Sequence, residues 1–131
     1  MKNEITPINK TELVESIGLH GITDMIKPLV KEIELFETHV AGTSYTDPGL
    51  LSALKTGDKL ILRREKDNKF DDLAVKFLNS DEVKIGYIPE KDNEIFARLM
   101  DAGKLLSAKI KNISNKGSYV KIDVTIFLVD F

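Results

Sequence analysis

The alternation of side chains near the C-terminus constrains the fold more than any other feature of this sequence. From Val120 to Leu128, an apolar residue stands at every second position, and the intervening polar positions are Lys121, Asp123 and Thr125. A period of two is that of a β-strand with one buried face. The run LLSAKIKNI lies just upstream, and residues 115–117 supply a turn between the two runs. We therefore predict a long antiparallel hairpin.

Further short strands are predicted upstream of this hairpin, at residues 32–42, 59–64, 73–78 and 83–88. In the first of these, strict alternation places Ile33 and Leu35 on one face and Phe36, Thr38 and Val40 on the other. Because both faces then carry apolar groups, we expect this strand to be bent or bulged.

Two short helices are predicted between the strands. Asp47 is a favourable N-cap before Pro48, and Gly57 can end the segment. The second helix precedes Gly103 and has its apolar positions spaced for one core-facing side, at Ile95, Phe96, Leu99 and Met100. The sequence has no repeat, so we expect a mainly β domain with two or three short helices, built as a curved antiparallel sheet or a partly open barrel.

Residues 1–31 differ in character from residues 32–131, which we assign to the β domain. Asn9 followed by Glu12 is a helix-start signal, and Leu13, Val14 and Ile17 form a short apolar stripe before Gly18. We predict a helical N-terminal extension that packs on the β domain. A chain of 131 residues, 42% hydrophobic, is otherwise expected to form one domain.

Composition narrows the class of function. The chain has no cysteine, which excludes disulfides, thiolate metal sites and cysteine nucleophiles, and we expect a cytoplasmic location. No stretch approaches the roughly 20 apolar residues of a membrane span, and the polar N-terminus is unlike a signal peptide. A net charge of −2 argues against a protein that coats a long run of phosphates. Any contact with nucleic acid is expected to be local.

Sequence motifs give no support to metal binding or catalysis. The run that starts at Asp67 resembles a calcium loop, but Asp72 and Leu78 occupy the positions that need Gly and Glu. His20 and His39 cannot form a zinc site without carboxylates, and no Walker loop, GxGxxG or GxSxG is present. An enzyme acting on DNA ends would need convergent carboxylates and a metal. We expect a non-catalytic protein with no metal and no cofactor.

Three ordered motifs resemble those of one known family. The first is a glycine followed shortly by an aromatic residue, Gly42 with Tyr45. The second is an arginine-acid turn ending in aromatic-Asp-x-x-Ala-hydrophobic, residues 64–75, and the third is an Ile-Gly-aromatic-Ile strand before a helix, residues 85–88. From about Phe36 to the C-terminus the chain is similar to the HIRAN domain, a module attached to SNF2-type helicases and also found as stand-alone bacterial proteins.

The resemblance implies an OB-like β-barrel that binds the 3′-hydroxyl end of single-stranded DNA, beside a helicase or repair protein. A carboxylate accepts a hydrogen bond from a free hydroxyl and repels a 3′-phosphate, and Asp71 is the residue expected in this role. Terminal bases are expected to stack on aromatic rings, and the candidates are Phe70, Tyr45, Tyr87 and, more weakly, Tyr119. The candidate for a phosphate contact is Arg64, with Lys66 and Lys69 near it.

Two departures from the family pattern support an alternative. DNA-binding members have an arginine and two aromatics where this chain has Ser44, Tyr45 and Thr46, and commonly an asparagine where it has Leu73. The alternative is a protein-interaction or oligomerisation module that keeps the barrel after loss of the DNA site. It predicts a buried Phe70 and an exposed apolar patch that involves the N-terminal helices.

Overall fold

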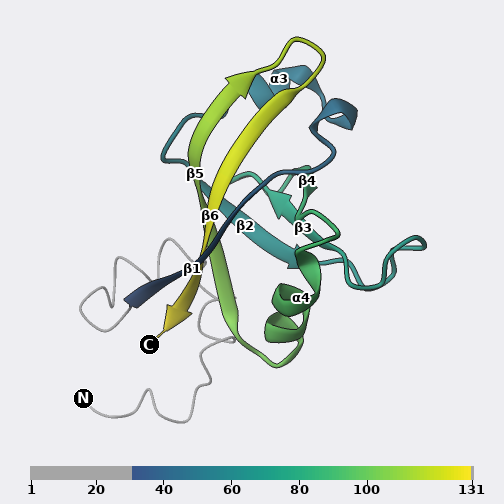
Figure 1. The fold of residues 1–131 in the computed structure, drawn as a ribbon, viewed down its shortest axis with the longest axis vertical. Coiled ribbons are helices and arrows are strands. Elements are labelled where there is room, and N and C mark those ends of the chain that lie inside the picture. Colours follow the sequence, from purple (N-terminus) through teal and green to yellow (C-terminus); the bar gives the residue numbers. More distant parts are fainter. Residues whose placement is uncertain (1–30, 131) are drawn as a thin grey trace.

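The computed structural model describes residues 31–130, and every structural statement below concerns this part of the chain. Within it, six strands form one antiparallel sheet in the order β1-β6-β5-β2-β3-β4 (Figure 1). The strands are β1 (Lys31–His39), β2 (Lys59–Arg64), β3 (Val75–Leu78), β4 (Lys84–Tyr87), β5 (Leu105–Asn115) and β6 (Val120–Asp130). The predicted helical extension lies outside the described residues, apart from Lys31, where β1 begins.

The C-terminal hairpin is confirmed as the longest element of the fold. β5 and β6 have eleven residues each and pair from Leu105 with Val129 to Asn115 with Val120. Ile122, Val124 and Ile126 are fully buried, as the alternation predicted. In the turn, Asn115 accepts a hydrogen bond from the Gly117 amide through its side chain. The hairpin forms the long curved ribbon at the centre of Figure 1.

The two ends of the sheet meet at a short seam, which makes it a partly open barrel. The Ala41 amide donates to the Tyr87 carbonyl at 2.8 Å, and the Tyr87 amide donates to the Ala41 carbonyl at 2.9 Å. Gly86 permits this approach, since a Cβ at this position would collide with the Val40 side chain and the Ala41 carbonyl. The Ile-Gly-aromatic motif therefore has a structural role in closing the barrel.

The first strand is bulged, as predicted, but the bulge changes which residues share a face. Ile33 pairs with Leu128 and Phe36 with Ile126, with the register shift between Glu34 and Phe36. Paired residues on antiparallel strands point to the same face, and Leu128 and Ile126 share a face because they are two positions apart on β6. Ile33 and Phe36 therefore lie on one side of the sheet. The prediction that they point to opposite faces was wrong, because strict alternation does not hold across a bulge.

Both predicted helices are present, each at one end of the barrel (Figure 1). α3 (Pro48–Ser52) is capped by the Asp47 carboxylate, which accepts from the Gly49 amide at 3.2 Å. α4 (Asn93–Asp101) buries Phe96 and Ala97 against the core. A 3-10 turn, η3 (Thr43–Tyr45), follows β1. Three strand predictions were too long, since β1 ends at His39, β3 begins at Val75 and β4 spans only Lys84–Tyr87. The first helix ends at Ser52, before the predicted stop at Gly57.

Candidate nucleic-acid interface

The loop at residues 65–74 joins β2 to β3 and projects away from the barrel as the teal loop in Figure 1. Its shape is set by polar side chains that bond to nearby backbone. The Asn68 side-chain oxygen accepts from the amides of Phe70 and Asp71, at 2.8 and 3.0 Å, and its nitrogen donates to Glu65 at 2.8 Å. Asparagine stabilises tight turns in this way. The turn leaves the Phe70 ring 96% exposed.

Asp71 follows Phe70 in the sequence and is half-buried. Its carboxylate accepts from the Leu73 amide at 2.9 Å and from the Asn93 side chain at 2.7 Å. Asn93 is itself only 3% exposed and stands in the first turn of α4, so a buried group fixes the direction of the carboxylate. Each carboxylate oxygen has two lone pairs, which leaves capacity for one further donor on each.

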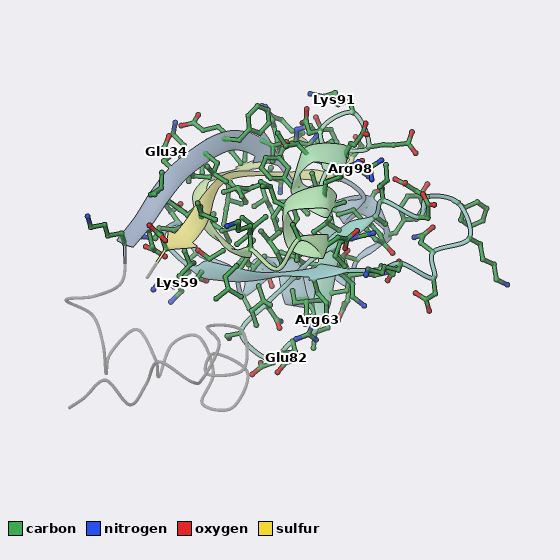
Figure 2. The ribbon with its side chains drawn as sticks, turned by 90° about the horizontal axis from the view of Figure 1, so that it is seen from below. Glu34, Lys59, Arg63, Glu82, Lys91 and Arg98 are labelled. Carbon is green, nitrogen blue, oxygen red and sulfur yellow. The ribbon has the colours of Figure 1, made fainter. Side chains whose placement is uncertain are left out.

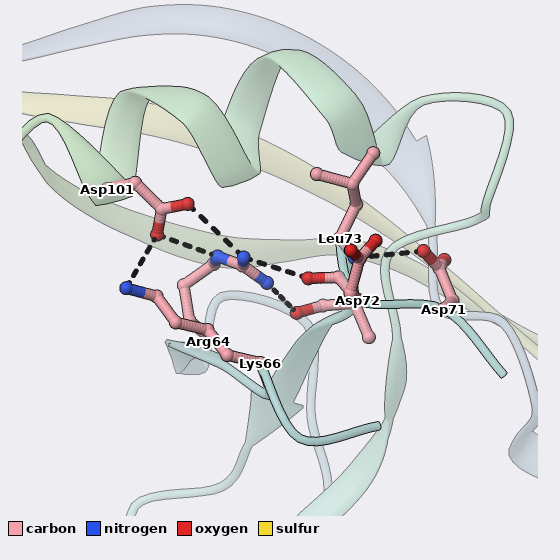
Figure 3. Close-up of polar contacts among 7 residues, drawn as sticks. Arg64, Lys66, Asp71, Asp72, Leu73 and Asp101 are labelled. Atoms are coloured by element: carbon pink, nitrogen blue, oxygen red, sulfur yellow. Dashed lines mark hydrogen bonds and ion pairs between the residues drawn. The ribbon is translucent and has the colours of Figure 1, made fainter. Parts of the chain in front are cut away.

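The mostly buried Arg64 side chain bonds to the backbone of the same loop (Figure 3). Its guanidinium donates to both carboxylate oxygens of Asp101, at 2.9 and 3.2 Å, and to the carbonyls of Ala74 and Asp72, at 2.7 and 2.9 Å. The side chain is 11% exposed. The bond from Arg64 holds the pKa of Asp101 below its ordinary value. Arg64 therefore joins the end of α4 to the loop, while Lys66 stays largely exposed, 3.5 Å from Asp101.

Tyr87 joins the seam of the barrel to this loop. Its hydroxyl donates to Glu65 at 2.7 Å, and the Lys84 ammonium donates to that hydroxyl at 3.1 Å and lies 4.8 Å from the ring centre. The Tyr87 bond, helped by Asn68 and Lys76, lowers the pKa of Glu65. Tyr87 is half-buried, and the Lys84 ammonium lies at the hydroxyl end of its ring. A single polar network thus runs from the seam to the Phe70 turn.

Tyr45 and Tyr119 belong to a neighbouring part of the surface. The Tyr45 ring is 94% exposed and the Tyr119 ring 46% exposed. On either side of Tyr45, Thr43 donates to the Val120 carbonyl at 2.7 Å and Thr46 donates to the Ile85 carbonyl at 2.8 Å. These bonds fix η3 between the start of β6, beside Tyr119, and β4, which carries Tyr87.

The six predicted residues fall into two groups. Phe70, Asp71, Tyr87 and Arg64 are linked through the loop at residues 65–74, and Tyr45 and Tyr119 are linked through η3. Within residues 31–130 the one ring-to-ring contact joins Phe36 to Phe96, so the candidate rings do not stack on one another. None of the six lines either of the two grooves beside β1 and α4.

Sequence reasoning missed the residues that hold this surface in shape, namely Glu65, Asn68, Asn93 and Asp101. Asn68 carried a usable local signal, because asparagine before an exposed turn commonly bonds to the following amides. Asn93 and Asp101 carried none, since they meet Asp71 and Arg64 across 22 and 37 positions of sequence. No group of three or more His, Asp or Glu side chains in the described region is arranged to hold a metal ion. None of its helices could span a membrane.

The six-stranded sheet, closed at the seam, is a small OB-like β-barrel domain. The HIRAN domain model matches residues 33–129, and the chain belongs to the HIRAN domain family. No curated protein matches the sequence.

Solved structures share this fold. A protein from Lactobacillus plantarum is 25% identical, with a TM-score of 0.71 over 78% of this chain and 99% of that one. The HIRAN domain of human HLTF is 15% identical, with a TM-score of 0.64 over 80% of this chain and 83% of that one. The HLTF HIRAN domain in its DNA-bound conformation is 16% identical, with a TM-score of 0.54 over 74% and 79% of the two chains. At least one homologue in the family therefore binds DNA.

Proposed function

We propose that this protein binds single-stranded DNA at an end with a free 3′-hydroxyl, without catalysing a reaction on it. The observation that carries the proposal is the pairing of an exposed ring with a fixed acid. Phe70 is 96% exposed, and the carboxylate of Asp71, the next residue, is held by the Leu73 amide and the buried Asn93. A base can stack on the ring while the terminal hydroxyl donates to the carboxylate. The DNA-bound conformation of a related HIRAN domain supports DNA as the ligand.

The other predicted residues take graded roles in this proposal. Tyr45 is the second stacking platform because its ring is 94% exposed. Tyr119 extends the same surface, whereas Tyr87 offers less ring surface because it is half-buried, with its hydroxyl already bonded to Glu65 and Lys84. Arg64 keeps the loop in its binding shape through Asp101 and the loop carbonyls, and the exposed Lys66 and Lys69 attract the phosphates. Such a module is suited to work beside a helicase in DNA repair or replication-fork processing.

The test is fluorescence anisotropy at low salt with a single-stranded DNA of about ten nucleotides, within the range that one OB-type fold accommodates. The same oligonucleotide is compared with a 3′-hydroxyl and with a 3′-phosphate. The wild-type protein is expected to prefer the hydroxyl end. Asp71→Asn is expected to remove most of that preference, because a charge-assisted bond is worth about 1.5–3 kcal/mol, or roughly tenfold or more in Kd.

Asp72→Asn is the matched control, because it removes the same charge one position away while Asp72 contributes only its carbonyl to the Arg64 contacts. Phe70→Ala is expected to weaken binding to both oligonucleotides by about 1–3 kcal/mol, since stacking does not read the terminal group. Equal binding of the two oligonucleotides by the wild-type protein, or equal effects of Asp71→Asn and Asp72→Asn, would refute end recognition through Asp71.

A further inference from the structure

The exposed large apolar side chains of the described region fall into two groups and one isolated residue. Tyr45, Phe70 and Tyr119 belong to the candidate nucleic-acid interface, and Val83 stands alone in the turn between β3 and β4. The other four gather on β1 and α4: Ile33, Leu35, Phe36 and Ile95. Single exposed apolar residues are ordinary, but a group on two adjacent elements is a feature of binding surfaces.

Two of these side chains, Phe36 and Ile95, line a groove between β1 and α4. Phe36 contacts Phe96 with ring centres 5.7 Å apart, and both line an open groove of about 500 Å³ together with Ile95. The bulge in β1 places Ile33 on the same face as Phe36, which extends the apolar surface along the strand. Ile95 is 63% exposed although it lies beside the buried Phe96. We call this surface the β1–α4 groove.

The rim of the β1–α4 groove on the helix side carries two basic and two acidic residues. Lys91 and Arg98 line the groove, each with an acidic neighbour at 3.3 Å, Asp92 and Glu94 respectively. Figure 2 shows Lys91 and Arg98 with α4, and Glu34 with β1, at the end of the molecule that faces the viewer. Because both basic side chains are largely exposed, they remain accessible to acidic groups of an occupant.

We propose that the segment preceding β1 occupies the β1–α4 groove, with Leu13, Val14 and Ile17 as the residues that cover Phe36 and Ile95. The chain enters β1 at Lys31, at the edge of the apolar surface. Fourteen positions separate Ile17 from Lys31, and fourteen extended residues span up to about 46–50 Å, so the reach is ample. Glu12 and Glu15 stand among the apolar residues and carry the charge opposite to that of the exposed Lys91 and Arg98.

A covalently connected segment has an advantage over any other occupant. A short tether gives an effective concentration in the millimolar range, which a second copy of the chain does not reach in dilute solution. Pairing of two β1 edges is further opposed by Glu32, Glu34 and Glu37, because like charges on an edge strand repel a second edge. The observations therefore favour the chain's own N-terminal segment over a dimer contact.

Engineered disulfides test this in the full chain, since the natural sequence has no cysteine. Ile17→Cys with Ile95→Cys is expected to form an intramolecular disulfide under mild oxidation. The matched control pairs Ile17→Cys with Ser118→Cys, in the turn between β5 and β6 at the end of the barrel opposite α4 (Figure 1). Equal rates of intramolecular disulfide formation in the two variants would overturn the proposal. Predominance of disulfide-linked dimers would also overturn it, and would indicate that a second copy of the chain occupies the groove.

Hydrogen exchange on the full chain gives an independent readout without cysteines. Ile17→Asp places a charge in the apolar contact and is expected to raise exchange at the α4 amides and in the first half of β1. Ser16→Asp adds the same charge one position away and is expected to change these amides much less. Identical exchange in wild type and Ile17→Asp would contradict the docking, whatever the disulfide result.

Discussion

The β5–β6 hairpin and the loop at residues 65–74 reach their shapes by different physical means. In the hairpin, Ile110 faces Val124 and Ala108 faces Ile126, and all four side chains are buried in the core. The loop buries Ala74 but depends on Asn68, Asp71 and Arg64 for its shape. Apolar burial is large and non-directional, whereas hydrogen bonds are directional and contribute little net stability. The hairpin thus supplies stability and the loop supplies the geometry of the candidate interface.

Removing apolar volume from the hairpin is expected to have the largest effect on stability. Ile122 is fully buried. Ile122→Ala is therefore expected to lower the free energy of unfolding by about 2–5 kcal/mol, through lost transfer energy and the cavity left behind. Urea denaturation measures this loss of stability, and Lys121→Ala, on the opposite face of the same strand, is the control. Similar losses in both variants would mean that hairpin burial is not the main source of stability.

The seam between the two ends of the sheet is the next most sensitive place. Gly86→Ala is expected to cost about 1–3 kcal/mol, because the added methyl would collide with the Val40 side chain and the Ala41 carbonyl. Gly49→Ala is the matched control, since a Cβ there meets the Asp47 side chain only at ordinary distances of 3.5 Å and beyond. Thermal melts compare the two variants, and equal melting temperatures would argue against close packing at the seam.

Sequence reasoning worked best where structure is set by local pattern. β2 was predicted with its observed bounds, and the hairpin and both helices were predicted from alternation, capping residues and apolar spacing. The orientation of Ile33 was not predictable in the same way. It depends on where the bulge of β1 falls against β6, and that register is decided by pairing across about 90 positions.

The candidate site likewise contains residues that the sequence could predict and residues whose contacts depend on distant parts of the chain. Family resemblance selected Phe70 and Asp71, and the structure gives them an exposed ring and a fixed carboxylate. Whether they bind DNA stays a prediction. The alternative function predicted a buried Phe70, which is wrong. It also predicted an exposed apolar patch that involves the N-terminal helices, and these lie outside the described residues. The inward bonds of Arg64 were not predictable, because its partner Asp101 lies at the far end of a helix whose docking only the fold determines.

Removing the hydrogen bonds that hold the loop is expected to lower the free energy of unfolding less than removing core volume does. The effect is expected to be confined to the loop. Arg64→Lys keeps the charge and loses the planar fork that reaches Asp101 and two carbonyls together. Loss of the bonds to the carbonyls alone is expected to cost about 1–2 kcal/mol. Hydrogen exchange should rise at Leu73 and Ala74 while the Val124 amide stays protected. Uniform loss of protection over the whole domain would mean that the loop and the hairpin are not separable.

Acid is expected to produce the smallest and most localised change. The Tyr87 bond holds the pKa of Glu65 below its ordinary value of 4.5, and Arg64 holds that of Asp101 below 3.8. A carboxyl whose pKa is lowered by folding stabilises the fold above its unfolded-state pKa, and this contribution is lost as the pH falls through its folded-state pKa. The loop is therefore expected to loosen below about pH 4.5 while the hairpin, whose core contains no carboxylate, stays folded.

NMR of the Tyr87 ring between pH 6 and pH 3 follows this change, with the Val124 amide as an internal reference for the hairpin. Glu65→Gln keeps an oxygen that can accept from the Tyr87 hydroxyl but does not titrate, so it should remove the Glu65 part of the transition and leave that of Asp101. A Tyr87 signal that moves only together with Val124 would show that acid acts on the whole domain. Independent movement of Tyr87 would show that the polar loop titrates on its own, as its directional bonds to Glu65 and Asn68 require.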